Sequence, residues 1–213
     1  MPTENKSNKI ITMVLAVIIT LAAITVIYIS LPQNEGNNKT SDENNGQQNG
    51  GGQTEESTIL TVIYGDEQTN YTLKDLEALE SYTGMGGRRT NYPKLEGKGN
   101  YTGVTVTTLV ELTAGDIENY NIIVYSNDGR NKTYNFSMVH GNVDIYNSTN
   151  ASNSASIGYG NVTMIASYKK DGKYLNESQD GKLRIAFVND KKELITSSGL
   201  WSKYVASIEI VEQ

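Results

Sequence analysis

The sequence predicts a β-rich α+β domain with mainly antiparallel strands and two short helices, occupying residues 57–213. Three features lead to this class. Several short segments alternate β-branched or apolar residues with polar ones, as half-buried strands do. Asp-Gly turns follow two of these segments, and only two stretches show helical spacing. An excess of strands over helices favours sheets with a few helices packed against them.

The first predicted strand and helix lie at the start of this domain. Residues 58–64 (TILTVIY) alternate as a strand does, and the following Gly-Asp pair forms a turn. Thr72 and Asp75 then have the spacing of a helix capping box, ahead of three leucines on one helical face. Residues 81–98 are rich in Gly and Arg without a clear period, so we expect a bent strand or a loop there.

The second predicted helix covers residues 105–113 (TVTTLVELT), and Gly115 ends it. Its apolar residues stand at near-helical spacing: Val106, Leu109, Val110 and Leu112. Residues 121–126 and 132–137 flank an Asp-Gly turn and predict a hairpin, because such turns need the positive φ that glycine allows.

The rest of the domain is predicted to be strands. Residues 161–168 precede a second Asp-Gly turn and repeat the hairpin pattern. Residues 183–188 (LRIAFV) and 205–211 (VASIEIV) complete the set.

An uncharged apolar run precedes the domain. Residues 10–31 are 22 residues long, about 33 Å as a helix, which is enough to span a bilayer. Lys6 and Lys9 precede the run and acidic residues follow it, so residues 1–9 are predicted to be a cytoplasmic tail and the domain to lie outside the cell. A cleaved signal peptide is the alternative, although its apolar part would be shorter and end in a small-x-small site.

A polar segment at residues 32–56 separates this predicted single-pass anchor from the domain. Residues 33–56 contain no aliphatic or aromatic side chain, which predicts a disordered linker. The net charge of −6 and the scattered Lys and Arg argue against a nucleic-acid partner. The expected partners are the membrane, through residues 10–31, and an envelope protein or a membrane redox protein.

Asn-x-Ser/Thr sequons occur more often than the composition leads one to expect. Such sequons are N-glycosylation acceptors in exported proteins, so the sequence predicts a glycoprotein. An Asn- and Thr-rich composition that creates them by accident is the alternative. The candidate residues are Asn38, Asn70, Asn100, Asn131, Asn135, Asn147, Asn150, Asn161 and Asn176.

Several segments together resemble one known family. The segment NYTGVTVTTLVELTAG is similar to the aromatic-x-Gly-Val-x-x-x-x-Leu-Leu motif in the molybdopterin-binding domain of the sulfite oxidase family. The residues that match this motif are Tyr101, Gly103, Val104, Leu109 and Val110. Further segments resemble that domain in the same order along residues 58–212: LTVIYGDEQTNYTLKDLEAL, YSNDGRNKTYNFSM, ASYKKDGKYL, GKLRIAFVND and WSKYVASIEIVE. The resemblance implies a sulfite-oxidase-like fold.

The resemblance fails where the family's chemistry depends on a cysteine. Catalytic members supply a cysteine thiolate to molybdenum, and the corresponding segment here carries Thr83, Gly84 and Met85. The chain has no cysteine, which also excludes disulfides, thiolate zinc sites and a cysteine nucleophile. A methionine thioether is neutral and does not replace a thiolate on a high-valent metal. We therefore expect no bound metal and no cofactor, with molybdopterin as the alternative.

Few residues suggest a site. Arg88 and Arg89 follow a glycine-rich stretch and could bind an anion such as the pterin phosphate, although an exposed turn with solvated charges is the simpler interpretation. The single histidine, His140, lies outside any hydrolase or metal motif and is expected to be a solvated or hydrogen-bonded loop residue.

The remaining candidates have structural explanations too. The carboxylates of Asp75, Glu77 and Glu80 are expected to face water rather than each other across a cleft. The Asp-Gly turn at 128–129 lacks the later Glu of a calcium loop.

These observations identify no catalytic residue. They favour a membrane-anchored, non-catalytic domain with a binding or envelope role, and the alternative is a molybdopterin-binding subunit of a membrane-associated oxidoreductase.

Overall fold

The computed structural model describes residues 57–90, 94–150, 155–160, 162–190 and 194–213. All of them belong to one compact unit, Gln53–Gln213. The predicted anchor at 10–31 and the predicted linker at 32–56 lie outside the described residues, as do Asn38 and Asn161. Within the described part of the chain, no helix is long and apolar enough to cross a membrane.

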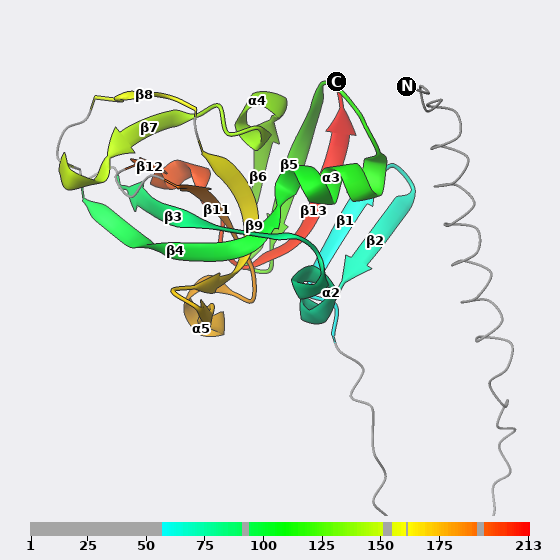
Figure 1. Ribbon diagram of the computed structural model, residues 1–213. Coiled ribbons are helices and arrows are strands. Elements are labelled where there is room, and N and C mark those ends of the chain that lie inside the picture. Colours follow the sequence, from blue (N-terminus) through cyan, green and yellow to red (C-terminus); the bar gives the residue numbers. More distant parts are fainter. Residues whose placement is uncertain (1–56, 91–93, 151–154, 161, 191–193) are drawn as a thin grey trace, which may run out of the picture. The chain divides into compact units, whose positions relative to one another are not determined.

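The described strands form two sheets (Figure 1). The first has the order β2-β1-β13-β5-β6, and of its pairings only β1 with β13 is parallel. Its strands are β1 (Leu60–Tyr64), β2 (Glu67–Tyr71), β5 (Tyr120–Ser126), β6 (Asn131–Asn135) and β13 (Val205–Glu212).

The second sheet has the order β10-β9-β11-β3-β12-β7-β8, and β4 pairs with both β3 and β9. The pairs β3–β4, β4–β9, β9–β11 and β11–β3 therefore close a ring, which removes open edges from these four strands. The strands are β3 (Ser81–Arg89), β4 (Leu95–Thr105), β7 (Asp144–Asn147), β8 (Gly158–Tyr159), β9 (Thr163–Lys170), β10 (Lys173–Tyr174), β11 (Arg184–Asn189) and β12 (Leu194–Ser197).

Four short α-helices and two 3-10 helices accompany the described strands. Helix α3 lies across the first sheet in Figure 1 and contacts β1, β2, β4 and β9, so it joins the two sheets. The helices are α2 (Leu73–Ala78), α3 (Val106–Ala114), α4 (Phe136–Val139), α5 (Glu177–Asp180), η1 (Ser148–Asn150) and η2 (Ser198–Leu200).

The structure confirms the β-rich α+β class and most of the predicted elements. Among its described residues it has two short α-helices more than the two predicted, α4 and α5, and several short strands that were not predicted. Three further details differ. Leu112, predicted on the apolar face of α3, is 55% exposed, whereas Val106, Leu109 and Val110 are buried. The strand predicted at 132–137 ends at Asn135, because the Asn135 side chain accepts a hydrogen bond from the Met138 backbone and starts α4. Strand β2 was not predicted because its sequence, EQTNY, is polar and mostly exposed.

The segment at 81–98, expected to be a bent strand or a loop, forms β3 and the start of β4. A register shift between Gly86 and Arg88 bends this pair. Gly115 ends α3 as predicted, with a positive φ of 74°.

The predicted capping box is present at the start of α2. The Thr72 hydroxyl accepts a hydrogen bond from the Asp75 backbone, and the Asp75 carboxylate accepts one from the Thr72 backbone at 2.8 Å. Hydrogen bonds from the Thr72 backbone and hydroxyl hold the pKa of Asp75 below its ordinary value of 3.8. Both partners thus satisfy backbone donors that the helix leaves free.

Replacing Thr72 with alanine should lower the free energy of unfolding by about 1 kcal/mol at neutral pH. A carboxyl whose pKa is lowered on folding stabilises the protein above its unfolded pKa, and this stabilisation is lost as the pH falls through the folded pKa. The difference between Thr72→Ala and the parent should therefore shrink as the pH falls below about 4, the ordinary pKa of an unfolded aspartate, toward the lower folded-state pKa of Asp75. Urea unfolding at several pH values measures it; a difference that stays constant would contradict this account.

Candidate functional site: a cationic cavity

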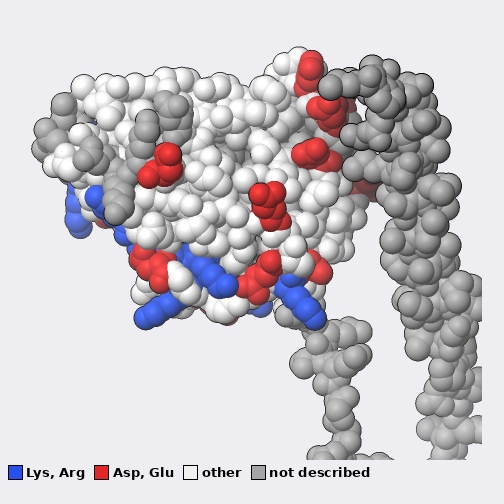
Figure 2. Space-filling model, viewed as in Figure 1, with Lys and Arg blue, Asp and Glu red and all other residues white. Residues whose placement is uncertain are grey.

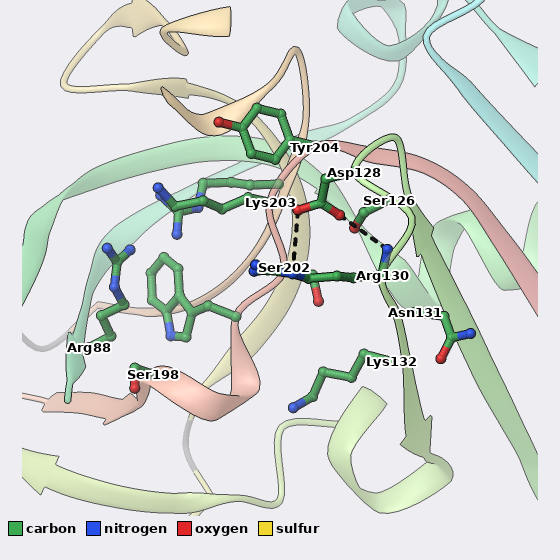
Figure 3. Close-up of a pocket in the computed structure, with 12 residues that line it drawn as sticks. Arg88, Ser126, Asp128, Arg130, Asn131, Lys132, Ser198, Ser202, Lys203 and Tyr204 are labelled. Carbon is green, nitrogen blue, oxygen red and sulfur yellow. Dashed lines mark hydrogen bonds and ion pairs between the residues drawn. The ribbon is translucent and has the colours of Figure 1, made fainter. Parts of the chain in front are cut away.

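A cavity of about 320 Å³ is lined by residues of β3, the β5–β6 hairpin, β11 and the segment 198–204 (Figure 3). Of the described residues that line it, five are cationic and one is acidic. They are Arg88, Arg130, Lys132, Arg184, Lys203 and the carboxylate Asp128. A surplus of positive charge at one cavity in a chain of net charge −6 indicates an anionic ligand.

Arg184 is the most buried of these cations. Its side chain is 3% exposed, and its Nη1 lies 2.8 Å from the Asp180 carboxylate. The guanidinium carbon lies 4.9 Å from the ring centre of Trp201 and 5.6 Å from that of Tyr101. Burial lowers the pKa of Arg184. The two rings and the ion pair fix the plane of the guanidinium.

Two donors of Arg184 lack an acceptor in the part of the chain that the structure describes. Nε and Nη2 are buried and make no hydrogen bond with the described residues. A buried donor without a partner costs about 1–3 kcal/mol, so such groups are rare unless a ligand or water satisfies them. These two N–H groups point in parallel from one edge of the guanidinium, which is the geometry that binds two oxygens of one carboxylate or phosphate.

Trp201 holds one wall of the cavity in place. Its Nε1 donates a hydrogen bond of 2.8 Å to the Thr196 hydroxyl inside the core. Its ring meets Tyr101 edge to face at 5.2 Å, and the Tyr101 hydroxyl donates to the Gly97 carbonyl at 2.6 Å. The surface against which Arg184 stacks is therefore rigid.

The other cations differ in how far they are neutralised. Arg130 Nε lies 3.7 Å from the Asp128 carboxylate on the same turn, and Figure 3 shows the two side by side. Lys203 lies 3.3 Å from Asp180, which it shares with Arg184. Lys132 donates to the Gly199 carbonyl, and burial lowers its pKa. One carboxylate, Asp180, thus serves two cations, and the acceptor of Lys132 is an uncharged carbonyl. The cavity therefore keeps a net positive charge.

The structure separates the two arginines that the sequence placed together. Arg88 lines the cavity and lies 3.4 Å from Glu96, whereas Arg89 lies with its guanidinium 5.1 Å from the Tyr146 ring. Successive residues of a strand point to opposite faces, which explains the separation. The expectation of an exposed turn is wrong, since both residues belong to β3 and are half-buried.

Outside this cavity, several Lys side chains lie beside carboxylates. Figure 2 shows basic side chains gathered around α5 and α2 on one face, with acidic ones between them. Lys169 lies 2.7 Å from Glu77, and Lys182 lies 3.9 Å from Glu177. Hydrogen bonds from Lys169 and from the Tyr174 hydroxyl lower the pKa of Glu77. Around α5 and α2 both signs of charge are therefore interspersed, whereas the acidic side chains higher on the same face in Figure 2 have no basic side chain of a described residue beside them.

The other candidates from the sequence have local roles. His140 is exposed at the end of α4, where its Nδ1 lies 2.9 Å from the Phe136 carbonyl and its ring lies 4.0 Å from the Phe136 ring. Asp75 belongs to the capping box, and Glu77 pairs with Lys169. None of these residues lines the cationic cavity.

Two sequons have a structural explanation besides glycosylation. The Asn147 side chain accepts hydrogen bonds from the Thr149 backbone and hydroxyl, and Asn176 does the same with Ser178. Asn followed two residues later by Ser or Thr is thus a turn and capping pattern here. The candidates whose exposure the structure describes are exposed, except Asn147, which is half-buried: Asn70, Asn100, Asn131, Asn135 and Asn176.

The segment 83–85, which the sequence resemblance places where catalytic members of the sulfite oxidase family carry their cysteine, is tightly packed at Gly84. A side chain added at Gly84 would place its Cβ 3.0 Å from the carbonyl oxygen and 3.1 Å from the amide nitrogen of Asn189. Among the described residues, no three His, Asp or Glu side chains gather as metal ligands would. In the described part of the chain, neither Gly84 nor a cluster of His, Asp and Glu side chains provides ligands for a metal, and the absence of a cofactor stays a prediction.

The important residues that sequence reasoning missed are Arg184, Trp201 and Lys203. One signal was available: Arg184 is the only charged residue in LRIAFV, a strand that is buried throughout. A buried cation needs a partner of opposite charge, so Arg184 could have been identified as a candidate binding residue.

No protein-family model matches the chain, and no curated protein matches it. Among solved structures, the fold is similar to the crystal structure of the sulfane dehydrogenase SoxCD from Paracoccus pantotrophus, with a TM-score of 0.50 and 13% sequence identity. The match covers 74% of this chain and 39% of that chain. At this identity the comparison concerns the fold alone, and it supports the fold expected from the sequence motifs.

Proposed function

We propose that residues 57–213 form a non-catalytic binding domain of sulfite-oxidase-like fold, and that its cationic cavity holds an oxyanion group of the ligand. The observation that carries this proposal is the pair of buried donors on Arg184, Nε and Nη2, which lack an acceptor among the described residues. One carboxylate or phosphate would satisfy both. Arg88 and Lys203 add positive charge beside it.

The proposed setting is the outer face of the cell membrane. The apolar run at 10–31 would anchor the chain, residues 32–56 would let the domain move away from the bilayer, and the sequons would carry glycans. The composition of these segments supports the proposal. A component of the envelope would then supply the anion.

A second candidate is a molybdopterin-binding subunit of an oxidoreductase. The structural similarity to a sulfane dehydrogenase and the sequence resemblance to the sulfite oxidase family favour it. The phosphate of a pterin cofactor is an anion that the cationic cavity could accept. The tight packing at Gly84 argues against a side chain there that could bind the metal of such a cofactor.

Purified protein from a host that makes the cofactor should contain neither molybdenum nor pterin above background. Metal analysis and fluorescent pterin extraction measure this, with a cysteine-containing relative as the positive control. Molybdenum and pterin each present at about one per protein chain would contradict the non-catalytic proposal and favour the second candidate.

Anion binding should depend on Arg88 and not on Arg89. Both substitutions, Arg88→Gln and Arg89→Gln, remove one charge from the same strand, but only Arg88 lines the cavity. We expect Arg88→Gln to weaken binding of inorganic phosphate about tenfold, or about 1.4 kcal/mol, and Arg89→Gln to leave it near the parent value.

The measurement is the phosphate-dependent shift in the thermal unfolding midpoint, with chloride at equal ionic strength as the control for screening. Equal losses in the two variants would indicate general charge attraction. A parent protein with no phosphate-specific shift would contradict the proposed function.

A further inference from the structure

A second cavity lies next to the cationic one. It has a volume of about 550 Å³ and is lined by the start of β1, the tip of the β5–β6 hairpin, α5 and the start of β13. Tyr204 lines both cavities, and the hairpin supplies Asp128 to the first and Asn127 to the second. The two cavities are therefore neighbours on either side of Tyr204.

Tyr204 is held in an unusual conformation. Its φ is 55°, which bulky residues rarely adopt. Its backbone N–H donates to the Asp180 carbonyl, its carbonyl accepts from the Asn127 backbone, and its hydroxyl donates to the Ser178 carbonyl, each at 2.8 Å. Strain that is maintained by several hydrogen bonds is typical of functional positions. The ring is thus fixed at the boundary between the two cavities.

The second cavity is polar and carries no net charge. Among the described residues that line it, the only ionic side chains are Glu177 and Lys182, which lie 3.9 Å apart and compensate each other. Thr58, Thr61 and Asn127 add neutral polar side chains, of which the Thr61 hydroxyl already donates to the Asn70 side chain at 2.8 Å. A ligand that carries charges along its whole length would fit the first cavity and not the second.

The strands that wall the second cavity exclude one common way of binding a peptide. β1 lies between β2 and β13, and β13 lies between β1 and β5. Neither strand has a free edge, so a peptide could not add to the sheet at this place. Hydroxyls, an amide and a fixed aromatic ring instead suit a hydroxyl-rich ligand with one flat apolar face.

We propose that the ligand is an oligosaccharide with an anionic end group. The end group binds the Arg184 donors in the cationic cavity, and the neutral sugar next to it lies against Tyr204 and the polar groups of the second cavity. This inference rests on the proposed function and adds the chemical class of the ligand.

Binding of four probes to the full chain tests the proposal. Two carry a carboxylate: glucuronate, and a disaccharide with glucuronate at its non-reducing end and a neutral second sugar. Two carry a phosphate: glucose 6-phosphate, and a disaccharide 6-phosphate. We expect the disaccharide to bind about tenfold more tightly than its monosaccharide in at least one pair, a gain of about 1.4 kcal/mol. The methyl ester of the glucuronate disaccharide and the disaccharide without its phosphate, which both lack the charge, should not bind.

Two variants assign this gain to the second cavity. The double substitution Thr58→Val and Asn127→Ala changes two exposed residues. It should lower the affinity for the disaccharide to that for the monosaccharide, and the affinity for the monosaccharide should stay unchanged. Arg184→Gln should abolish binding of both. Equal affinities within both pairs in the parent would overturn this inference and leave the proposed function standing. Absence of binding by every probe, inorganic phosphate included, would overturn both.

Discussion

Replacing Gly103 with alanine is expected to lower the free energy of unfolding by about 3 kcal/mol or more, because the new methyl group has no space. A Cβ at this position would lie 2.2 Å from the Ala166 carbonyl oxygen and 2.6 Å from the Ser167 Cα. Both atoms belong to the backbone of β9. Strand β4, which contains Gly103, pairs with β9 on one side and with β3 on the other. Neither neighbour can move aside without breaking the ring of strands.

Gly158→Ala is the matched control. A Cβ at Gly158 would meet the Ile145 side chain at 3.5 Å, an ordinary contact, so the change should stay within about 0.5 kcal/mol. Urea unfolding followed by the fluorescence of Trp201, the only tryptophan of the chain, measures both variants. Similar unfolding midpoints for the two would contradict the close approach of β4 and β9.

Gly103 also belongs to the part of the fold that could be predicted from the sequence. The motif around Tyr101 and Gly103 predicted the fold, and the structure gives its physical reason: Tyr101 packs on Trp201, and Gly103 allows β4 to approach β9. The strands with clear alternation and the helix with a capping box were predictable for the same reason, since their signals are local.

Elements without a local signal could not be predicted. β7, β8 and β12 are short, and their existence depends on pairing between residues distant in the sequence, such as Ile195 with Tyr146. The cavity has the same origin, because it brings together residues from β3, β11 and the segment 198–204. The only local sign of this cavity in the sequence is the single charge of Arg184 in an apolar strand.

The second large effect concerns the ion pair between Arg184 and Asp180. Asp180→Asn should lower the free energy of unfolding by about 3 kcal/mol, because it leaves a buried guanidinium without its counter-charge. Arg184→Met should cost about 1 kcal/mol, since it removes the buried charge together with its two unsatisfied donors. Asp180 then remains partly exposed, with Lys203 3.3 Å away.

Added phosphate should separate the two variants further. In Asp180→Asn an anion on the free donors of Arg184 supplies the missing negative charge, so phosphate should stabilise this variant more than the parent protein. In Arg184→Met the donors are gone, and phosphate should stabilise no more than chloride at equal ionic strength. Unfolding free energies of both variants in the two salts test this. If Arg184→Met proves the more damaging substitution, or if phosphate rescues neither variant, then Arg184 is held by packing alone and its two free donors do not mark a ligand site.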